Sequence, residues 1–321
     1  MRVGAIDVGS NSIRLLVAEI ADPATGGGLV TVARAGEVCR LARGLDRSGR
    51  IEPELATRAG TIAADFLRRA RSLGASHVVI GATAALRTAS NGREVAEAIT
   101  GRTGLPVRVL GGEEEARLMY RSVIAGLGYQ ARHAACVVFD LGGGSTEVVS
   151  GLGPEVGRWA SLPFGAVSLT ERHLHSDPPS TAEREALAEE VRTTIMQVCT
   201  YMPERTPVLA GVGGTVTVLG LLDRGLEAYE PTLLEGWRIL PARLDGWIEE
   251  LMSSTVGERR ARATVGDGRA DILAAGAGVV AEICRRFPSP GLICSTQGLR
   301  YGLARLAAEE AAAAAGDAAG S

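Results

Sequence analysis

Ile6-Asp7-Val8-Gly9-Ser10-Asn11-Ser12, close to the amino terminus, is matched later in the chain by Phe139-Asp140-Leu141-Gly142-Gly143-Gly144-Ser145. In both stretches an apolar run of β type leads to an Asp, a turn of small residues follows, and a second apolar run comes after the turn. The two Asp residues are 133 positions apart (140 − 7), so the repeat has the size of a domain and not of a solenoid unit. It predicts two half-domains, each with a hairpin that presents backbone N–H groups and a carboxylate.

The elements around the two hairpins follow one order, in which three strands are succeeded by alternating helices and strands. In the first half we expect strands at 2–8, 13–20, 29–38, 77–80 and 107–110, and helices at 53–73, 92–102 and 113–125. In the second half we expect strands at 134–140, 145–151, 156–163, 207–212 and 291–294, a long helix whose start is marked by the capping box Ser180–Glu183, a helix-rich insertion at 241–287 and a terminal helix at 298–310.

This order predicts an α/β fold of two lobes with mixed sheets flanked by helices. The layout resembles that of the actin-like (ribonuclease H-like) superfamily, in which phosphate binds between the lobes, so we expect the active site in the interdomain cleft. The expected domains are residues 1–125 and 126–297, with the terminal helix packed back on the first lobe and residues 311–321 forming a disordered tail.

Composition excludes several classes of function. The chain has 321 residues, a formal net charge of −3 and 34 basic residues, all of them Arg. A P-loop of the Walker type needs a Lys and is therefore excluded. No broad nucleic-acid face is implied at this net charge, and anions must be bound by Arg, backbone amides or a metal ion.

The expected location is the cytoplasm. The five cysteines form no C-x-x-C pair, and several lie in apolar runs, which favours buried free thiols in a reducing compartment. Asp7 interrupts the first apolar run too early for a signal peptide, and no apolar stretch approaches the roughly 18 residues that a membrane span needs.

The glycine turn after Asp140 is the strongest single signal. Consecutive glycines allow the backbone to direct its N–H groups inward as an anion-binding nest, and an Asp at the end of the strand can hold Mg²⁺ against the bound phosphate. Glu147 is two residues beyond Ser145, so their side chains share one face of the following strand. The alternative interpretation is an ordinary glycine-rich hairpin with a solvated Asp.

The first hairpin offers a second anion site. Ser10, Asn11 and Ser12 add side-chain donors to the turn, and Arg14 follows on the next strand. Ser and Asn also favour turns for their own reasons, so turn chemistry alone is the alternative.

Four other motifs carry weaker signals. Glu113, Glu114 and Glu115 open a helix, where acidic residues complement the helix dipole without any further role. Arg87 lies where a strand passes into a loop, a common position for a functional arginine. The alternative is an ordinary surface arginine. The glycine cluster that joins a strand to a helix N-terminus is another amide-rich anion site; its members are Gly213, Gly214 and Thr215. Arg269 and Asp271 lie at the start of a helix. The alternative interpretation is that Asp271 only caps this helix.

The histidines do not make a convincing site. His173 and His175 could be a metal pair, but their position next to Asp177-Pro178-Pro179 favours solvated loop residues.

The chain resembles the exopolyphosphatase/guanosine pentaphosphate phosphohydrolase family, in its short two-domain form. The stretches that carry the resemblance run in family order over essentially the whole chain; they are residues 5–14, 82–87, 112–117, 139–147, 211–215, 269–271 and 298–300. The resemblance implies Mg²⁺-dependent hydrolysis of a terminal phosphoanhydride, with Mn²⁺ as the alternative ion. Inorganic polyphosphate, in short chains, is the expected substrate, and guanosine pentaphosphate is the alternative.

The resemblance also implies roles for individual residues. Glu115, the Glu directly before Ala116-Arg117, would be the general base that orients the attacking water. Asp140 and Glu147, with Asp7 as a third candidate, would hold the metal ion. The residues that would bind phosphate are Ser10, Asn11, Ser12, Arg14, Arg87, Gly142, Gly143, Gly144, Ser145, Gly213, Gly214, Thr215 and Arg269.

Two competing functions stay open at this point. One is a polyphosphate or alarmone sensor without catalysis, and the other is a small-molecule kinase of the same superfamily. Tyr301 stands where the resemblance leads us to expect Glu, so the contact made by that Glu must be absent or replaced. Family analogy favours a homodimer, and neither a nucleic acid nor a membrane is expected as a partner.

Overall fold

The computed structural model describes residues 1–21, 28–265 and 268–319. The chain forms two compact units: unit 1 comprises Met1–Leu118 and the chain from Leu299 onward, and unit 2 comprises Met119–Gly298. The change from unit 1 to unit 2 falls between Leu118 and Met119, inside helix α5 (Gly112–Leu127), a few residues before the boundary at residue 125 that the sequence predicts.

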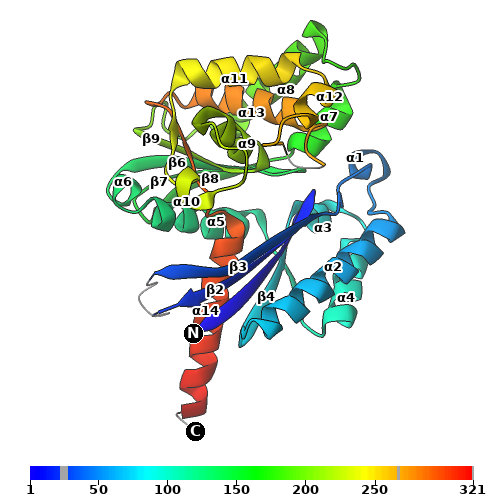
Figure 1. The fold of residues 1–321 in the computed structure, drawn as a ribbon, viewed down its shortest axis with the longest axis vertical. Coiled ribbons are helices and arrows are strands. Elements are labelled where there is room, and N and C mark those ends of the chain that lie inside the picture. Colours follow the sequence, from blue (N-terminus) through cyan, green and yellow to red (C-terminus); the bar gives the residue numbers. More distant parts are fainter. Residues whose placement is uncertain (22–27, 266–267, 320–321) are drawn as a thin grey trace. The chain divides into compact units, whose positions relative to one another are not determined.

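Unit 1 is built on a five-stranded mixed sheet (Figure 1). The strand order is β3-β2-β1-β4-β5; the strands are β1 (Arg2–Val8), β2 (Ser12–Ile20), β3 (Leu29–Val38), β4 (His77–Ala82) and β5 (Val107–Val109). Strands β1, β2 and β3 are antiparallel neighbours, whereas β4 runs parallel to β1 and β5 runs parallel to β4. The carboxyl ends of β1, β4 and β5 therefore lie at one edge of the sheet.

Helices cover both faces of this sheet. Successive side chains of β1 point to opposite faces, so each face contributes apolar residues to a core. Ile6 and Val8 pack in the cluster that includes α2, and Val3 and Ala5 pack in the cluster that includes α14. Helix α2 begins at Pro53, as expected, and buries its predicted apolar stripe. The helices of this part are α1 (Leu45–Ser48), α2 (Pro53–Ser72), α3 (Ala84–Thr88), α4 (Gly92–Thr103) and α14 (Leu299–Ala319).

Unit 2 repeats the arrangement. Its six-stranded sheet has the order β10-β11-β9-β6-β7-β8; the strands are β6 (Ala135–Leu141), β7 (Thr146–Leu152), β8 (Glu155–Leu162), β9 (Val208–Gly213), β10 (Arg238–Ile239) and β11 (Leu292–Cys294). Strands β8, β7 and β6 are antiparallel, and β6, β9 and β11 are parallel. Apart from β10, this is the topology of unit 1, so the predicted α/β fold with two mixed sheets is confirmed.

A large hydrophobic core lies on one face of the second sheet. Phe139, Leu141 and Val148 from the sheet meet side chains from α8, α11 and α13, which Figure 1 shows on that face. The helices of unit 2 that follow α5 are α6 (Tyr129–Arg132), α7 (Ala166–His173), α8 (Thr181–Val198), α9 (Gly214–Arg224), α10 (Pro231–Leu234), α11 (Pro241–Ser253), α12 (Val256–Arg260) and α13 (Leu273–Arg286).

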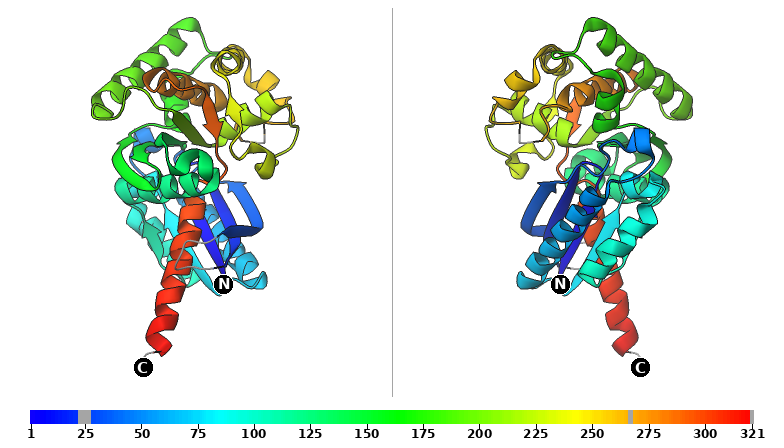
Figure 2. Two further views of the ribbon diagram at one scale, coloured as in Figure 1. Left: turned by 90° about the vertical axis from the view of Figure 1, so that its left-hand side faces the viewer. Right: turned by 90° about the vertical axis from the view of Figure 1, so that its right-hand side faces the viewer.

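The structure differs from the sequence-based expectation in several short elements and at the end of the chain. Helices α1, α3, α6, α7 and α10 and strand β10 were not predicted. Residues 311–319, predicted to belong to a disordered tail, continue helix α14 (Figure 2). The last two residues of that predicted tail lie outside the described part of the chain.

Two predictions from composition can be compared with the structure. All five cysteines are free thiols; Cys284 is partly buried and the other four are buried. Within the described residues, no helix has both the length and the apolar character of a membrane span.

Candidate functional site

In unit 1, the predicted motifs meet at the carboxyl ends of the parallel strands. The N–H of Thr83 donates to the carbonyl of Val8 (3.3 Å), and the N–H of Leu110 donates to the carbonyl of Ala82 (2.9 Å). The chain segments that leave β1, β4 and β5 are thereby tied to one another. Ligand sites of open α/β sheets form at such strand ends.

The turn between β1 and β2 is held in place through its carbonyl groups. The carbonyl of Asn11 accepts the N–H groups of Cys39 (2.9 Å) and Arg40 (2.8 Å), and the carbonyl of Ser10 accepts the N–H of Ala42 (2.9 Å). Arg40 makes this approach with a φ of 59°, a conformation uncommon for a residue with a side chain. The peptide groups around Ser10, Asn11 and Ser12 are therefore fixed in orientation.

Asp7 and Arg14 are direct cross-strand partners at the end of this hairpin. Asp7 is only 8% exposed. Burial raises the pKa of its carboxyl group, and the positive charges of Arg14 and Arg300 act in the opposite direction. Asp7 is thus a buried acid under the influence of two arginines of the same unit.

Glu115 differs from the two acidic residues before it. It is 7% exposed, and its carboxylate accepts a hydrogen bond from Nη1 of Arg87 at 2.7 Å. The same Arg87 nitrogen donates to the carbonyl of Leu110 (2.9 Å). Glu113 and Glu114 are more exposed and form surface ion pairs with Arg117 and Arg108. The arginine that the sequence assigned to phosphate binding therefore also fixes the side chain assigned as the base.

In unit 2, the glycine turn joins β6 to β7. The turn is closed by a hydrogen bond from the N–H of Gly142 to the carbonyl of Ser145 (3.0 Å). On the side of α7, the N–H of Ala166 donates to the carbonyl of Gly142 (2.9 Å), and those of Val167 and Ser168 donate to that of Gly143 (2.9 and 3.2 Å). In a planar trans peptide the carbonyl and the next N–H point in opposite directions. The N–H groups of Gly143 and Gly144 are therefore directed away from α7, as an anion nest requires.

Asp140 and Glu147 lie opposite each other at the base of this turn, as cross-strand partners of β6 and β7. Glu147 is 2% exposed, and its Oε1 accepts a hydrogen bond from Ser161 at 2.9 Å. Gly298 lies beside this pair: a Cβ atom added there would be 3.6 Å from Oδ2 of Asp140, an ordinary van der Waals contact.

These two carboxylates fit a magnesium ion, because Mg²⁺ is typically bound by one or two carboxylates and completes its shell with water and phosphate oxygens. Asp7, the third predicted metal residue, belongs to unit 1, whereas Asp140 and Glu147 belong to unit 2. Among the described residues, no group of three or more His, Cys, Asp or Glu side chains is arranged to hold a metal ion. Within unit 2, the ion would be held by the Asp140–Glu147 pair.

The later glycine motif lies beside this turn, since β9 runs parallel to β6 with Gly213 opposite Leu141. Gly213 has a φ of 106°, and a Cβ there would lie 2.4 Å from the carbonyl oxygen of Leu141. Arg269 covers the start of α9: a Cβ at Gly214 would lie 2.4 Å from its Nη1. Thr215 is buried in the first turn of α9. All the residues that the sequence assigned to unit 2 thus gather at one edge of its sheet.

Sequence reasoning missed Gly165, which lies against the glycine turn. A Cβ at this position would be 2.5 Å from the carbonyl oxygen of Gly142 and from the carbonyl carbon of Gly143. The signal that would have found it is Pro163-Phe164-Gly165, a strand end followed by a residue without a side chain. The interpretation of His173 as a solvated loop residue was wrong: it is the last residue of α7, a helix that the sequence did not predict, and its side chain pairs with Glu190.

The unexpected Tyr301 has a structural explanation. It is 1% exposed. Its hydroxyl accepts a hydrogen bond from Nε of Arg34 (2.8 Å) and is hydrogen-bonded to Thr31 (3.2 Å). In this chain the side chain that contacts Arg34 at this point is therefore a phenol and not a carboxylate.

Comparison with known proteins places these observations in a family. The model of the Ppx/GppA phosphatase family matches residues 16–308. Exopolyphosphatase 2 of Mycobacterium tuberculosis is 37% identical over 293 residues, which are 89% of this chain and 91% of the relative. The crystal structure of a family member from Aquifex aeolicus superposes with a TM-score of 0.81 at 29% identity, covering 98% of both chains. An exopolyphosphatase-like protein superposes with a TM-score of 0.88 at 29% identity, covering 95% of this chain and 96% of the other. The chain belongs to the Ppx/GppA phosphatase family.

Proposed function

We propose that this protein is a Mg²⁺-dependent exopolyphosphatase that releases the terminal phosphate of inorganic polyphosphate. The observation that carries the proposal is the Asp140–Glu147 pair beside a glycine turn whose N–H groups are directed outward. A carboxylate pair for a metal ion and amides for phosphate oxygens are the parts that phosphoryl transfer needs. The relative named Exopolyphosphatase 2, aligned over nearly its full length, supports polyphosphate as the substrate.

In this proposal Glu115 is the general base. A general base must be positioned to accept a proton from the attacking water, which requires its side chain to be held in one orientation. Arg87 supplies that restraint through its 2.7 Å hydrogen bond to the carboxylate. A binding protein without catalysis would have no use for a buried acid held in this way, which argues against the sensor.

The remaining residues bind and orient the substrate. The N–H groups of the turn 142–145 receive the terminal phosphate, and the first hairpin with Ser10, Asn11 and Ser12 offers further donors. Arg14, Arg87 and Arg269 compensate the charge of neighbouring phosphates. Bound by Asp140 and Glu147, Mg²⁺ would neutralise charge on the phosphate oxygens.

The test is phosphate release from tripolyphosphate, long-chain polyphosphate and guanosine pentaphosphate under identical conditions, with Mg²⁺ or with a chelator. We expect phosphate release from polyphosphate, fastest with the short chain. Activity should be lost on chelation, because the carboxylate pair then holds no metal ion. Release from guanosine pentaphosphate alone, or undiminished release in the chelator, would contradict the proposal. ADP formation that depends on an acceptor would identify a kinase instead.

A further inference from the structure

The glycine turn is held by a helix that is itself held by a charged cluster. Helix α7 donates three N–H groups to the carbonyls of Gly142 and Gly143, as described above. A movement of α7 would therefore change the orientation of the two peptide groups, 142–143 and 143–144, whose N–H groups are proposed to bind phosphate. The position of α7 is thus part of the geometry of the site.

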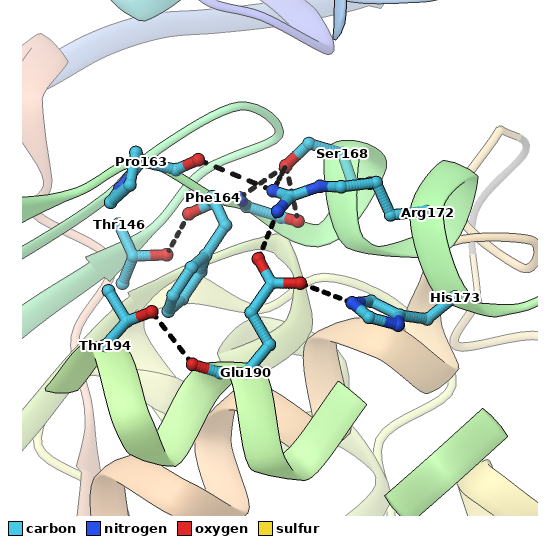
Figure 3. A network of polar contacts seen from close by, with 9 residues as sticks. Thr146, Pro163, Phe164, Ser168, Arg172, His173, Glu190 and Thr194 are labelled. Atoms are coloured by element: carbon cyan, nitrogen blue, oxygen red, sulfur yellow. Dashed lines mark hydrogen bonds and ion pairs between the residues drawn. The ribbon is translucent and has the colours of Figure 1, made fainter. Parts of the chain in front are cut away.

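Arg172 fastens the start of α7 (Figure 3). Its Nη2 donates to the carbonyl of Pro163 and to the hydroxyl of Ser168, both at 3.5 Å, and its Nε donates to the carbonyl of Ser168 at 3.4 Å. The hydroxyl of Ser168 in turn accepts the N–H of Gly165 at 2.9 Å. A single guanidinium group therefore contacts the segment that precedes α7 and the first turn of the helix.

Glu190 of α8 holds Arg172 from the other side. Its two carboxylate oxygens bind Nη1 of Arg172 and Nε2 of His173, which are adjacent residues at the end of α7 (Figure 3). Helix α8 is anchored in the core of unit 2 by Leu187, Val191 and Ile195. A continuous path of contacts thus runs from this core through Glu190 and Arg172 to the turn.

We propose that Arg172 and Glu190 are positioning residues for the phosphate-binding turn; the inference rests on the proposed function in taking that turn as the place where phosphate binds. The pair is partly exposed, with 34% and 27% of the side chains accessible, and ion pairs of this kind add little to stability. Arg172 uses its planar fork on several acceptors at once, which a Lys cannot do. A role in orientation therefore explains the cluster better than a role in stability.

The experiment compares the full-length wild type with Arg172→Met, Arg172→Lys and Glu190→Gln. The matched control is Glu189→Gln on the same helix, because Glu189 pairs with Arg192 on the exposed surface. The probes are inorganic tripolyphosphate with Mg²⁺, measured by calorimetry and by steady-state kinetics, and, without ligand, amide hydrogen exchange of residues 166–168, whose N–H groups donate to the carbonyls of Gly142 and Gly143. Glu190→Gln retains the shape of the side chain, so it tests the proposal even if Arg172→Met does not fold.

We expect Kd and KM for tripolyphosphate to rise about tenfold in Arg172→Met and Glu190→Gln, with kcat changed less than about twofold, as for coupling through a contact network. Arg172→Lys should not restore binding, and Glu189→Gln should match the wild type. Exchange at 166–168 should accelerate only in the Arg172 and Glu190 variants.

Folded variants with wild-type affinity and wild-type exchange at 166–168 would overturn the inference. If the wild type binds no tripolyphosphate, the proposed function fails instead. The exchange measurement then decides alone whether these residues position the turn, because it needs no ligand.

Discussion

Three consecutive glutamates at the start of α5 show that a sequence alone does not reveal which of several identical residues has a functional role. Composition and the helix dipole account for Glu113, Glu114 and Glu115 alike. The sequence selected Glu115 only through the resemblance to a family. The structure separates it physically, since it is the buried member and is bound by Arg87. That contact joins residues 28 positions apart, so no local pattern contains it.

Gly165→Ala should disturb the glycine turn, because the new methyl group would overlap backbone atoms of Gly142 and Gly143. A clash with backbone cannot be relieved by a rotamer change, and overpacking of this kind costs about 1–3 kcal/mol. We expect a lower free energy of unfolding in urea and weaker binding of tripolyphosphate.

The matched control for this prediction is Gly246→Ala on α11, where a Cβ meets nothing within 4 Å. The same change there should be neutral or stabilise by about 0.5–1 kcal/mol, as Ala for Gly does in a helix. Equal stability and affinity of Gly165→Ala and wild type would show that the contact seen in the structure is wrong.

Asn91→Ala should destabilise unit 1 for a different reason. The Asn91 side chain is buried, and it donates to the carbonyl and accepts the N–H of Ile51, both at 2.9 Å. Without it two buried backbone groups lose their partners, which costs about 2–4 kcal/mol in total. Urea unfolding should detect this loss, whereas Ser90→Ala, at an exposed neighbour, should have little effect; a similar loss in both variants would speak against the assignment.

At the scale of an element, α8 was predictable and α7 was not. The capping box of α8 is confirmed: the hydroxyl of Ser180 accepts the N–H of Glu183, and the carboxylate of Glu183 accepts the N–H of Ser180. Its signal is contained in four neighbouring residues. The first N–H groups of α7 are accepted by carbonyls of a turn more than twenty residues earlier, so its formation depends on the tertiary structure.

The cap of α8 also predicts a dependence of stability on pH. Hydrogen bonds from the hydroxyl of Ser176 and from the N–H groups of Ser180 and His175 lower the pKa of Glu183 from 4.5 to about 2. The folded state therefore favours the carboxylate, and this stabilisation is complete above about pH 4.5 and is lost as the pH falls toward 2.

We expect the unfolding free energy of Glu183→Gln to fall less steeply than that of the wild type on acidification through this range. Urea unfolding at several pH values measures the difference. Glu185→Gln, at an exposed position on the same helix, serves as the control and should behave as the wild type does. Parallel pH profiles of Glu183→Gln and wild type would rule out the cap as the cause.

At the scale of the whole molecule, the duplicated architecture follows from the duplicated hairpin. The order β3-β2-β1-β4-β5 of unit 1 corresponds to β8-β7-β6-β9-β11 of unit 2, as the repeated succession of strands and helices predicts. What the repeat could not predict is β10, whose two residues form a strand only because they pair with β11. Short elements of this kind acquire their structure from a neighbour and carry almost no signal of their own.

Hydrolysis of polyphosphate by this member of the Ppx/GppA family, with Glu115 as the proposed base, can be tested directly. The most direct measurement is the rate of phosphate release from tripolyphosphate by Glu115→Gln, together with its Kd for the same compound and with Glu113→Gln as the control. The account predicts a fall in kcat of about 10²–10⁴-fold, with Kd within about threefold of the wild type and a control that is fully active. A folded Glu115→Gln protein that releases phosphate at the wild-type rate would contradict it.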